Sequence, residues 1–196
     1  FNKDFFTLGN FKNLLRSSFP LLMAALGQTL IILTGGIDLS LGGIVALCNV
    51  VCVMSMNPDS AWGFVPALGA AAVVGLACGA VNGVLVTKGR LAPIIVTIAT
   101  TAVFDGMALL LMPNPGGSVH KAFAKFLTRG YSGAVPFLLF ILILCLVRSL
   151  ANSTPYGKAL RAIGGSENAA YSTGIRVGKI KFCAYCLAGL LCAVAG

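Results

Sequence analysis

The chain has 196 residues, of which 58% are hydrophobic and only 10% are charged. Soluble domains carry about 25% charged residues, so this chain lacks the polar groups that a water-exposed surface needs, and we expect lipid to cover much of it. The formal net charge of +9 does not indicate nucleic-acid binding, because most basic residues lie between or beside apolar stretches and so reflect membrane topology.

Six apolar stretches are predicted to form helices in the membrane. A helix needs about 20 mainly apolar residues to cross the hydrocarbon layer, and it satisfies its backbone groups internally. The first two stretches would each be only about 24 Å long at 1.5 Å per residue. We therefore expect an all-α, polytopic transmembrane helical bundle with short or broken helices. The six stretches are residues 19–34, 41–56, 62–86, 92–112, 135–150 and 182–196.

Two amphipathic stripes are predicted to lie in the headgroup plane, either as interfacial anchors or as a docking surface. The first falls within residues 3–16, ahead of the first apolar stretch, and the second within residues 121–129. The apolar members of the first stripe are Phe5, Phe6, Leu8, Phe11, Leu14 and Leu15, and those of the second are Phe123, Phe126 and Leu127.

Residues 34–43 separate the first two apolar stretches and place an ionisable group, Asp38, between them. Glycines let the backbone leave the helix here, and non-helical backbone at membrane depth is tolerated where it lines a cavity. One interpretation puts Asp38 and Ser40 on a solute path. The other, equally open, has Asp38 capping the next helix at the membrane interface. The glycines of this predicted helix break are Gly35, Gly36 and Gly42.

The third apolar stretch carries Gly75, Gly79 and Gly83 at four-residue spacing. One helix face then lacks side chains, so we predict a packing ridge for a neighbouring helix. Asn82, beside this ridge, either bonds to another helix or lines the solute path. Asp105 lies within the fourth stretch, where a carboxylate is costly enough to mark a cavity, a partner or a pore. We take both as candidate path residues.

The polar segment 148–181 contains six basic residues and one acid, Glu167. The positive-inside rule predicts that this segment is cytoplasmic, which puts residues 113–133 outside despite their three basic residues. Thr154 followed by Pro155 is typical of an N-cap and a first helical position.

Two short helices are expected in this segment. The first should end just before Gly164, and the second should begin after Ser166 and stop at Gly174. Such a stiff, small-residue protrusion would fit the groove of a soluble motor protein, because a floppy loop would absorb the motor's movement.

No catalytic residue, metal site or bound cofactor is predicted. The sequence lacks a P-loop of the form G-x-x-x-x-G-K-[ST], so this chain is not expected to hydrolyse ATP itself. Cys183 and Cys186 would need two further ligands for zinc, and the only histidine, His120, is far away in sequence. Paired catalytic groups for a membrane enzyme are not found.

Several motifs resemble those of the permeases of ribose, xylose and galactoside ABC importers, and the similarity covers nearly the whole chain. These motifs are Thr34-Gly-Gly-Ile-Asp-Leu-Ser-Leu-Gly42, Val81-Asn-Gly83, Thr154-Pro-Tyr-Gly-Lys-Ala-Leu-Arg-Ala-Ile-Gly-Gly165, Glu167-Asn-Ala-Ala170 and Thr173-Gly-Ile175.

The resemblance implies a permease domain over residues 1–196 in the bacterial inner membrane that carries a monosaccharide. Cytoplasmic ATPase subunits, an external sugar-binding protein and a second permease copy would be its partners. Family members are longer, so we expect this chain to lack one N-terminal span and several C-terminal spans. The residues that match the family's ATPase-coupling motif are Gly157, Arg161, Ala162, Gly164, Glu167, Ala169, Ala170 and Gly174.

Two alternatives stay open at this point. Broken helices also occur in ATP-independent carriers of small polar solutes. A truncated permease could also insert and pair in the membrane without conducting anything.

Overall fold

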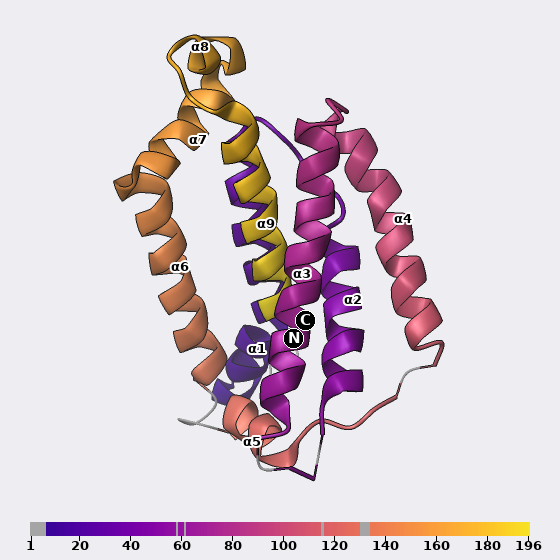
Figure 1. Ribbon diagram of the computed structural model, residues 1–196. Helices are drawn as coiled ribbons and strands as arrows, with labels where there is room; N and C mark the ends of the chain where they lie inside the picture. Colours follow the sequence, from indigo (N-terminus) through magenta and orange to yellow (C-terminus); the bar gives the residue numbers. More distant parts are fainter. Residues whose placement is uncertain (1–6, 58, 61, 115, 130–133) are drawn as a thin grey trace.

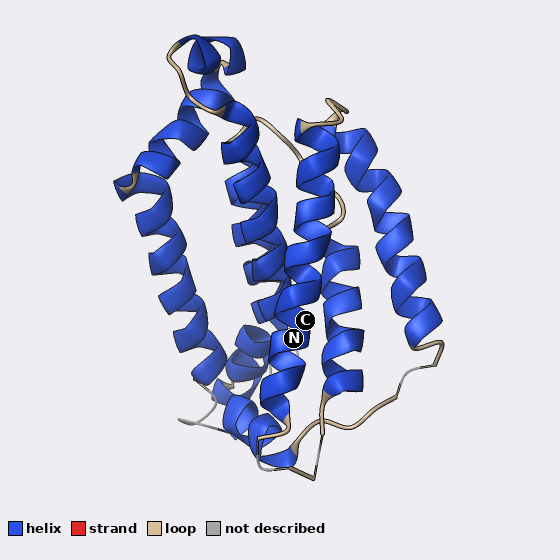
Figure 2. Ribbon diagram, in the orientation of Figure 1, coloured by secondary structure: helices blue, strands red, loops and turns tan. Residues whose placement is uncertain are grey.

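The computed structural model describes residues 7–57, 59–60, 62–114, 116–129 and 134–196, and all regular secondary structure in these ranges is helical (Figures 1 and 2). The all-α prediction is confirmed. The helices are α1 (Leu8–Ile32), α2 (Leu41–Ser55), α3 (Phe64–Thr87), α4 (Pro93–Leu111), α5 (Lys121–Arg129), α6 (Val135–Ser153), α7 (Pro155–Gly165), α8 (Glu167–Ser172) and α9 (Val177–Ala195).

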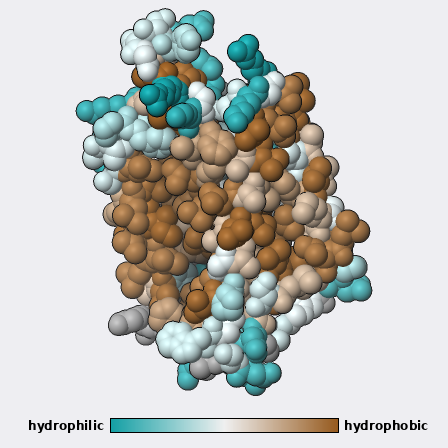
Figure 3. All heavy atoms as spheres, viewed as in Figure 1, coloured by the Kyte–Doolittle hydropathy of each residue, from teal (hydrophilic) through white to brown (hydrophobic). Residues whose placement is uncertain are grey.

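Five of the described helices, α1, α3, α4, α6 and α9, are long and apolar enough to cross a membrane, and α2 is a shorter apolar helix of 15 residues. Figure 3 shows a broad hydrophobic band with hydrophilic residues gathered above and below it. The short helices α7 and α8 lie at one end of the bundle and α5 lies at the other (Figure 1). This arrangement is that of a multi-pass membrane bundle.

Helix α1 differs from the sequence prediction. Its 25 residues run without interruption from the described part of the first amphipathic stripe into the first apolar stretch. The Thr7 side chain caps its start by accepting from the Asn10 N–H at 3.3 Å. No turn-forming residue separates the two parts, so the helix continues through them and through Pro20. Phe5 and Phe6 fall outside the described residues.

The second stripe forms α5, which packs against the bundle as well as facing outward. The Phe123 ring stacks on Phe64 of α3, with 5.1 Å between ring centroids, whereas Phe126 is 55% exposed. Only part of this stripe is therefore available to the membrane interface.

The centre of the bundle is the close crossing of α3 and α9. A Cβ built on Gly75 would collide with the backbone of Gly189, and one built on Gly79 would collide with the carbonyl oxygen of Tyr185. At Gly83 the added atom would lie 2.9 Å from the Phe182 ring. The glycine ridge of α3 thus lets two helix backbones touch, which is how helices without a hydrophobic driving force associate in lipid.

Candidate functional site

A non-helical segment, residues 33–40, joins α1 to α2 and will be called the break. Gly35 has φ of +76°, a left-handed conformation that costs glycine little. Gly42 lies beyond the break, in the first turn of α2. In Figure 1 the break descends from the α7 end of the bundle, so α2 begins well inside it. The break therefore places polar residues inside the bundle, among its apolar helices.

Side chains alternate along the extended part of the break. Asp38 and Ser40 point inward, with 5% and 0% of their surface exposed, whereas Ile37 and Leu39 are 43% and 50% exposed. This two-residue period is that of extended backbone. It explains how one short segment turns apolar groups outward and a carboxylate inward.

Asp38, Ser40 and Asn82 form one buried hydrogen-bonded network. The Asp38 Oδ1 accepts from the Ser40 N–H at 2.7 Å and from the Ser40 hydroxyl at 2.6 Å. The Asn82 Nδ2 of α3 donates to the Ser40 Oγ at 2.7 Å. The Gln28 Oε1 of α1 accepts from the Asp38 N–H at 3.4 Å. Three of the four predicted path residues, Asp38, Ser40 and Asn82, therefore meet at the break.

Two more buried polar atoms lie in this region without a hydrogen-bond partner among the described residues, Asn82 Oδ1 and the Tyr185 hydroxyl. A Cβ added to Gly36 would lie 3.4 Å from that hydroxyl, so Tyr185 borders the break. Buried polar groups are normally paired, and these two offer hydrogen-bonding capacity that the chain itself leaves unused. Tyr185 was not among the residues predicted for the solute path, although a phenol inside an apolar stretch is a signal of a buried polar group.

Asp105 does not join this network. It is exposed on α4, and its Oδ1 would lie 3.0 Å from a Cβ built on Gly43 of α2. The contact from α4 to the break comes instead from Thr101, whose hydroxyl donates to the Leu39 carbonyl oxygen at 3.1 Å. The two acidic residues predicted for the solute path thus occupy different environments.

The end helices α7 and α8 are each capped at their N-termini. The Thr154 hydroxyl accepts from the Gly157 N–H at 3.2 Å and Pro155 is the first residue of α7. Ser166 caps α8 by accepting from the Ala169 N–H at 3.3 Å. The predicted end of α7 is wrong by two residues, because Gly164 is helical and the chain leaves the helix only at Ser166. These caps satisfy backbone N–H groups at the start of each helix.

Some residues of the predicted coupling motif are buried in the protein and the others are exposed on its surface. Gly157 is buried where α6 turns into α7, and a Cβ there would collide with the Ala151 carbonyl. Ala170 packs with Ile163 and Val177 in a small core beneath α8. The exposed members are Arg161, Ala162, Gly164, Glu167, Ala169 and Gly174.

Polar contacts hold this end to the rest of the chain. Arg161 donates to Asn152 Oδ1 of α6 at 2.6 Å, and Lys181 of α9 pairs with Glu167 at 2.6 Å. The Tyr156 hydroxyl donates to the Ile180 carbonyl at 3.4 Å. Burial raises the pKa of the Tyr156 phenol above its ordinary value, so it stays a neutral donor. The end helices are therefore tied to both α6 and α9.

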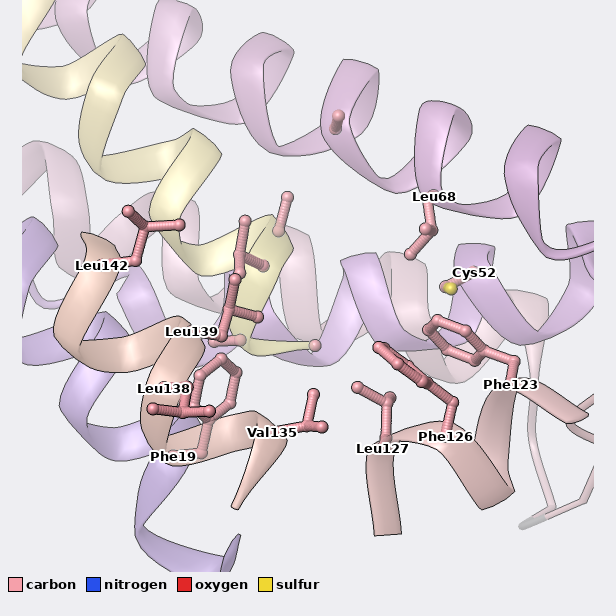
Figure 4. Close-up of a pocket in the computed structure, with 15 residues that line it drawn as sticks. Phe19, Cys52, Leu68, Phe123, Phe126, Leu127, Val135, Leu138, Leu139 and Leu142 are labelled. Carbon is pink, nitrogen blue, oxygen red and sulfur yellow. The ribbon is translucent and has the colours of Figure 1, made fainter. Parts of the chain in front are cut away.

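An apolar cavity of about 740 Å³ lies toward the α5 end of the bundle (Figure 4). Phe19, Phe123, Phe126 and Leu139 point into it, and its wall offers no charged side chain. A polar solute would lose its hydrogen bonds to water there without replacing them. This cavity does not suit a sugar and is distinct from the network at the break.

Together, the multi-pass bundle, the buried polar break and the capped end helices define a membrane transport subunit. The chain belongs to the family described as "Branched-chain amino acid transport system / permease component", whose family model matches residues 10–196. It is accordingly a multi-pass protein of the bacterial inner membrane, and the family's members are transport subunits rather than enzymes.

The chain is also similar in sequence to individual import permeases. The chain is 39% identical to the ribose import permease protein RbsC of Bacillus subtilis over 100% of its length, covering 61% of that protein. It is 33% identical to RbsC of Escherichia coli K12 over 98% of its length, covering 61%. It is 31% identical to the autoinducer 2 import permease LsrC of Yersinia pseudotuberculosis, covering 56%. The chain thus spans about three fifths of these relatives. No solved structure matches it.

Proposed function

We propose that this chain belongs to an ABC importer permease that moves a ribose-like monosaccharide inward across the membrane. Two relatives that cover nearly the whole chain are named ribose import permeases. The observation that carries the proposal is the buried Asp38–Ser40–Asn82 network at a helix break, because a polar cluster at membrane depth is costly unless it serves a path.

The chemistry of this network suits a polyhydroxylated solute. A carboxylate and an amide oxygen accept hydrogen bonds, while a hydroxyl both donates and accepts. Asn82 Oδ1 and the Tyr185 hydroxyl have no partner among the described residues. A passing sugar hydroxyl would pair with them when the break opens. Asp105, exposed on α4, would act on a different part of the path or at a neighbouring subunit.

The energy for transport would enter through α7 and α8. An ATPase subunit would contact the exposed residues of the motif, with Arg161 and Glu167 as polar anchors. Gly157 and Ala170, which are buried, would act by shaping the segment. A sugar-binding protein would dock at the α5 end, and a second permease copy would complete the path. ATP would be bound and hydrolysed on the partner.

The direct test is uptake by the intact permease, reconstituted in proteoliposomes with its ATPase and binding protein. We expect ATP-dependent uptake of labelled ribose that excess ribose suppresses and excess leucine does not. Leucine is the decisive competitor because the family description names branched-chain amino acids. ATP-dependent leucine uptake without ribose uptake, or ribose uptake that needs no ATP, would contradict the proposal.

The role of Glu167 can be separated from its ion pair. The pair with Lys181 leaves the Glu167 side chain 57% exposed, and exposed pairs are worth at most about 1 kcal/mol. If Glu167 also anchors the ATPase, Glu167→Lys should lower uptake by about tenfold, equivalent to about 1.4 kcal/mol. The added exchange Lys181→Glu should not restore it.

The control for this prediction is Asn168→Lys, which places a lysine at the neighbouring exposed position and so tests whether a new positive side chain on this face is harmful by itself. We expect it to leave uptake within about twofold of the wild type. Recovery of full uptake in the Glu167→Lys, Lys181→Glu double variant would show instead that Glu167 serves only to hold α8 against α9.

A further inference from the structure

Helix α7 touches the break backbone to backbone. A Cβ built on Gly164 would lie 2.5 Å from the Leu33 carbonyl oxygen and 3.4 Å from the Gly35 nitrogen. Seen from the other side, a Cβ on Gly35 would lie 3.7 Å from the Gly164 Cα. The end helices thus meet the polar network's own segment directly, with no side chain between them.

The break is stiff on its side of this contact. The N–H groups of Gly35 and Gly36 donate to Ile32 O and Ile31 O at 2.9 and 3.2 Å, which fixes both glycines to the end of α1. Asp38 follows Gly36 by two residues, and its own N–H donates to the Gln28 side-chain oxygen. A displacement at Gly35 would therefore reach Asp38 through a short, hydrogen-bonded stretch.

Helix α7 is equally well held on its side. Leu160 is fully buried in a cluster with Leu30 of α1 and Ala184 of α9. Ile163 is buried against Ala170 and Val177. Because Ile163 of α7 packs in one cluster with Ala170 of α8, the two helices would move as one body when a partner pushes on their exposed face.

We propose that Gly164 is the point at which the end helices act on the solute path, by moving Gly35 and with it the Asp38 network. This inference rests on the proposed function. Asn82 Oδ1 and the Tyr185 hydroxyl are buried and have no partner among the described residues. A passing sugar hydroxyl would pair with them when the break shifts.

Glycine is required at position 164 for this contact. Ordinary van der Waals contact begins at 3.4 Å, so the 2.5 Å approach to Leu33 O leaves a methyl group about 0.9 Å short of room. Alanine at 164 would push α7 away from the break by a large part of that distance. A misplacement of about 1 Å is enough to cost as much as 100-fold in rate at a well-ordered site.

Gly165 supplies a matched control. It is the last residue of α7, directly after Gly164, it is helical and exposed, and a Cβ there would meet nothing within 4 Å. Both alanine substitutions make the same change of residue type in the last turn of α7, so they change intrinsic helix propensity in the same direction. A difference between Gly164→Ala and Gly165→Ala in complexes that bind the ATPase equally well therefore reports the contact with the break.

The experiment compares both variants in the intact permease, reconstituted with its ATPase and binding protein, and measures ribose uptake and ATP hydrolysis together. For Gly164→Ala we expect the ribose carried per ATP hydrolysed to fall at least tenfold, with ATPase still bound. For Gly165→Ala we expect a change of less than twofold. An unchanged ratio in a folded Gly164→Ala complex would overturn the inference.

A second measurement keeps the inference testable if Gly164→Ala does not fold. Spin labels at Gly165→Cys and Ile37→Cys, both exposed sites, should keep their separation when ATP binds, while the separation between Gly165→Cys and Ile95→Cys on α4 changes. The reverse pattern would overturn the inference. Absence of any ribose uptake by the wild type would instead refute the proposed function, and the label distances would still report on the contact.

Discussion

Replacing Gly79 with leucine is expected to abolish the folded bundle. A single Cβ at this position would already collide with the Tyr185 carbonyl on α9, and leucine adds three further carbons. Overpacking a core side chain costs about 1–3 kcal/mol, and here the opposing group is backbone, which cannot rotate away. Because helices in lipid associate through close packing, α9 would have to separate from α3.

Gly69→Leu is the control for this prediction. It lies on the same helix and is exposed, and a Cβ there meets nothing within 4 Å. Size-exclusion chromatography and thermal unfolding of the intact protein in detergent would compare the two. We expect aggregation or loss of a cooperative transition for Gly79→Leu and wild-type behaviour for Gly69→Leu. Equal melting temperatures would show that α3 and α9 do not cross at Gly79.

The second large effect is expected at Asp38. Asp38→Asn keeps the shape of the side chain but replaces a carboxyl group with an amide, which also carries a donor. Both Ser40 donors point at the same carboxylate oxygen, and hydrogen bonds to charged groups contribute about 1.5–3 kcal/mol, against about 1 for neutral ones. If the network lines the path, ribose uptake should fall at least about tenfold.

Asp59→Asn provides the matched control, since it makes the same change at an exposed loop position. Both variants should bind the ATPase and elute as the wild type does, because only Asp38 belongs to the buried network. Wild-type uptake by Asp38→Asn across a full range of ribose concentrations would remove Asp38 from the path and leave it as a structural cap of α2.

The membrane helices could be predicted from the sequence because their signal is local. Long apolar runs bounded by glycine, proline and polar residues mark where these helices begin and end. The structure has α2 at 41–55, against a predicted stretch of 41–56, and α4 at 93–111, against a predicted stretch of 92–112. The boundary of α1 was missed because no breaker separates its amphipathic start from its apolar part.

Contacts between distant segments could not be read in this way. Gly164 looked like a helix stop, since glycine often follows a helix end, yet it is helical, and the absence of a side chain there lets α7 approach Leu33 closely. The sequence likewise could not separate Asp38 from Asp105. Each is a carboxylate beside apolar residues, and only the fold shows that one is enclosed and the other exposed.

The segment carrying α7 and α8 must face the cytoplasm if an ATPase is to push on it. Sidedness labelling tests this directly in intact cells, using the complete protein with the exposed thiols Cys145 and Cys183 replaced by serine. Single cysteines are placed at the exposed positions Ser118 and Ser166. A membrane-impermeant maleimide should label Ser118→Cys from outside and Ser166→Cys only after permeabilisation. Labelling of Ser166→Cys in unbroken cells would contradict the account.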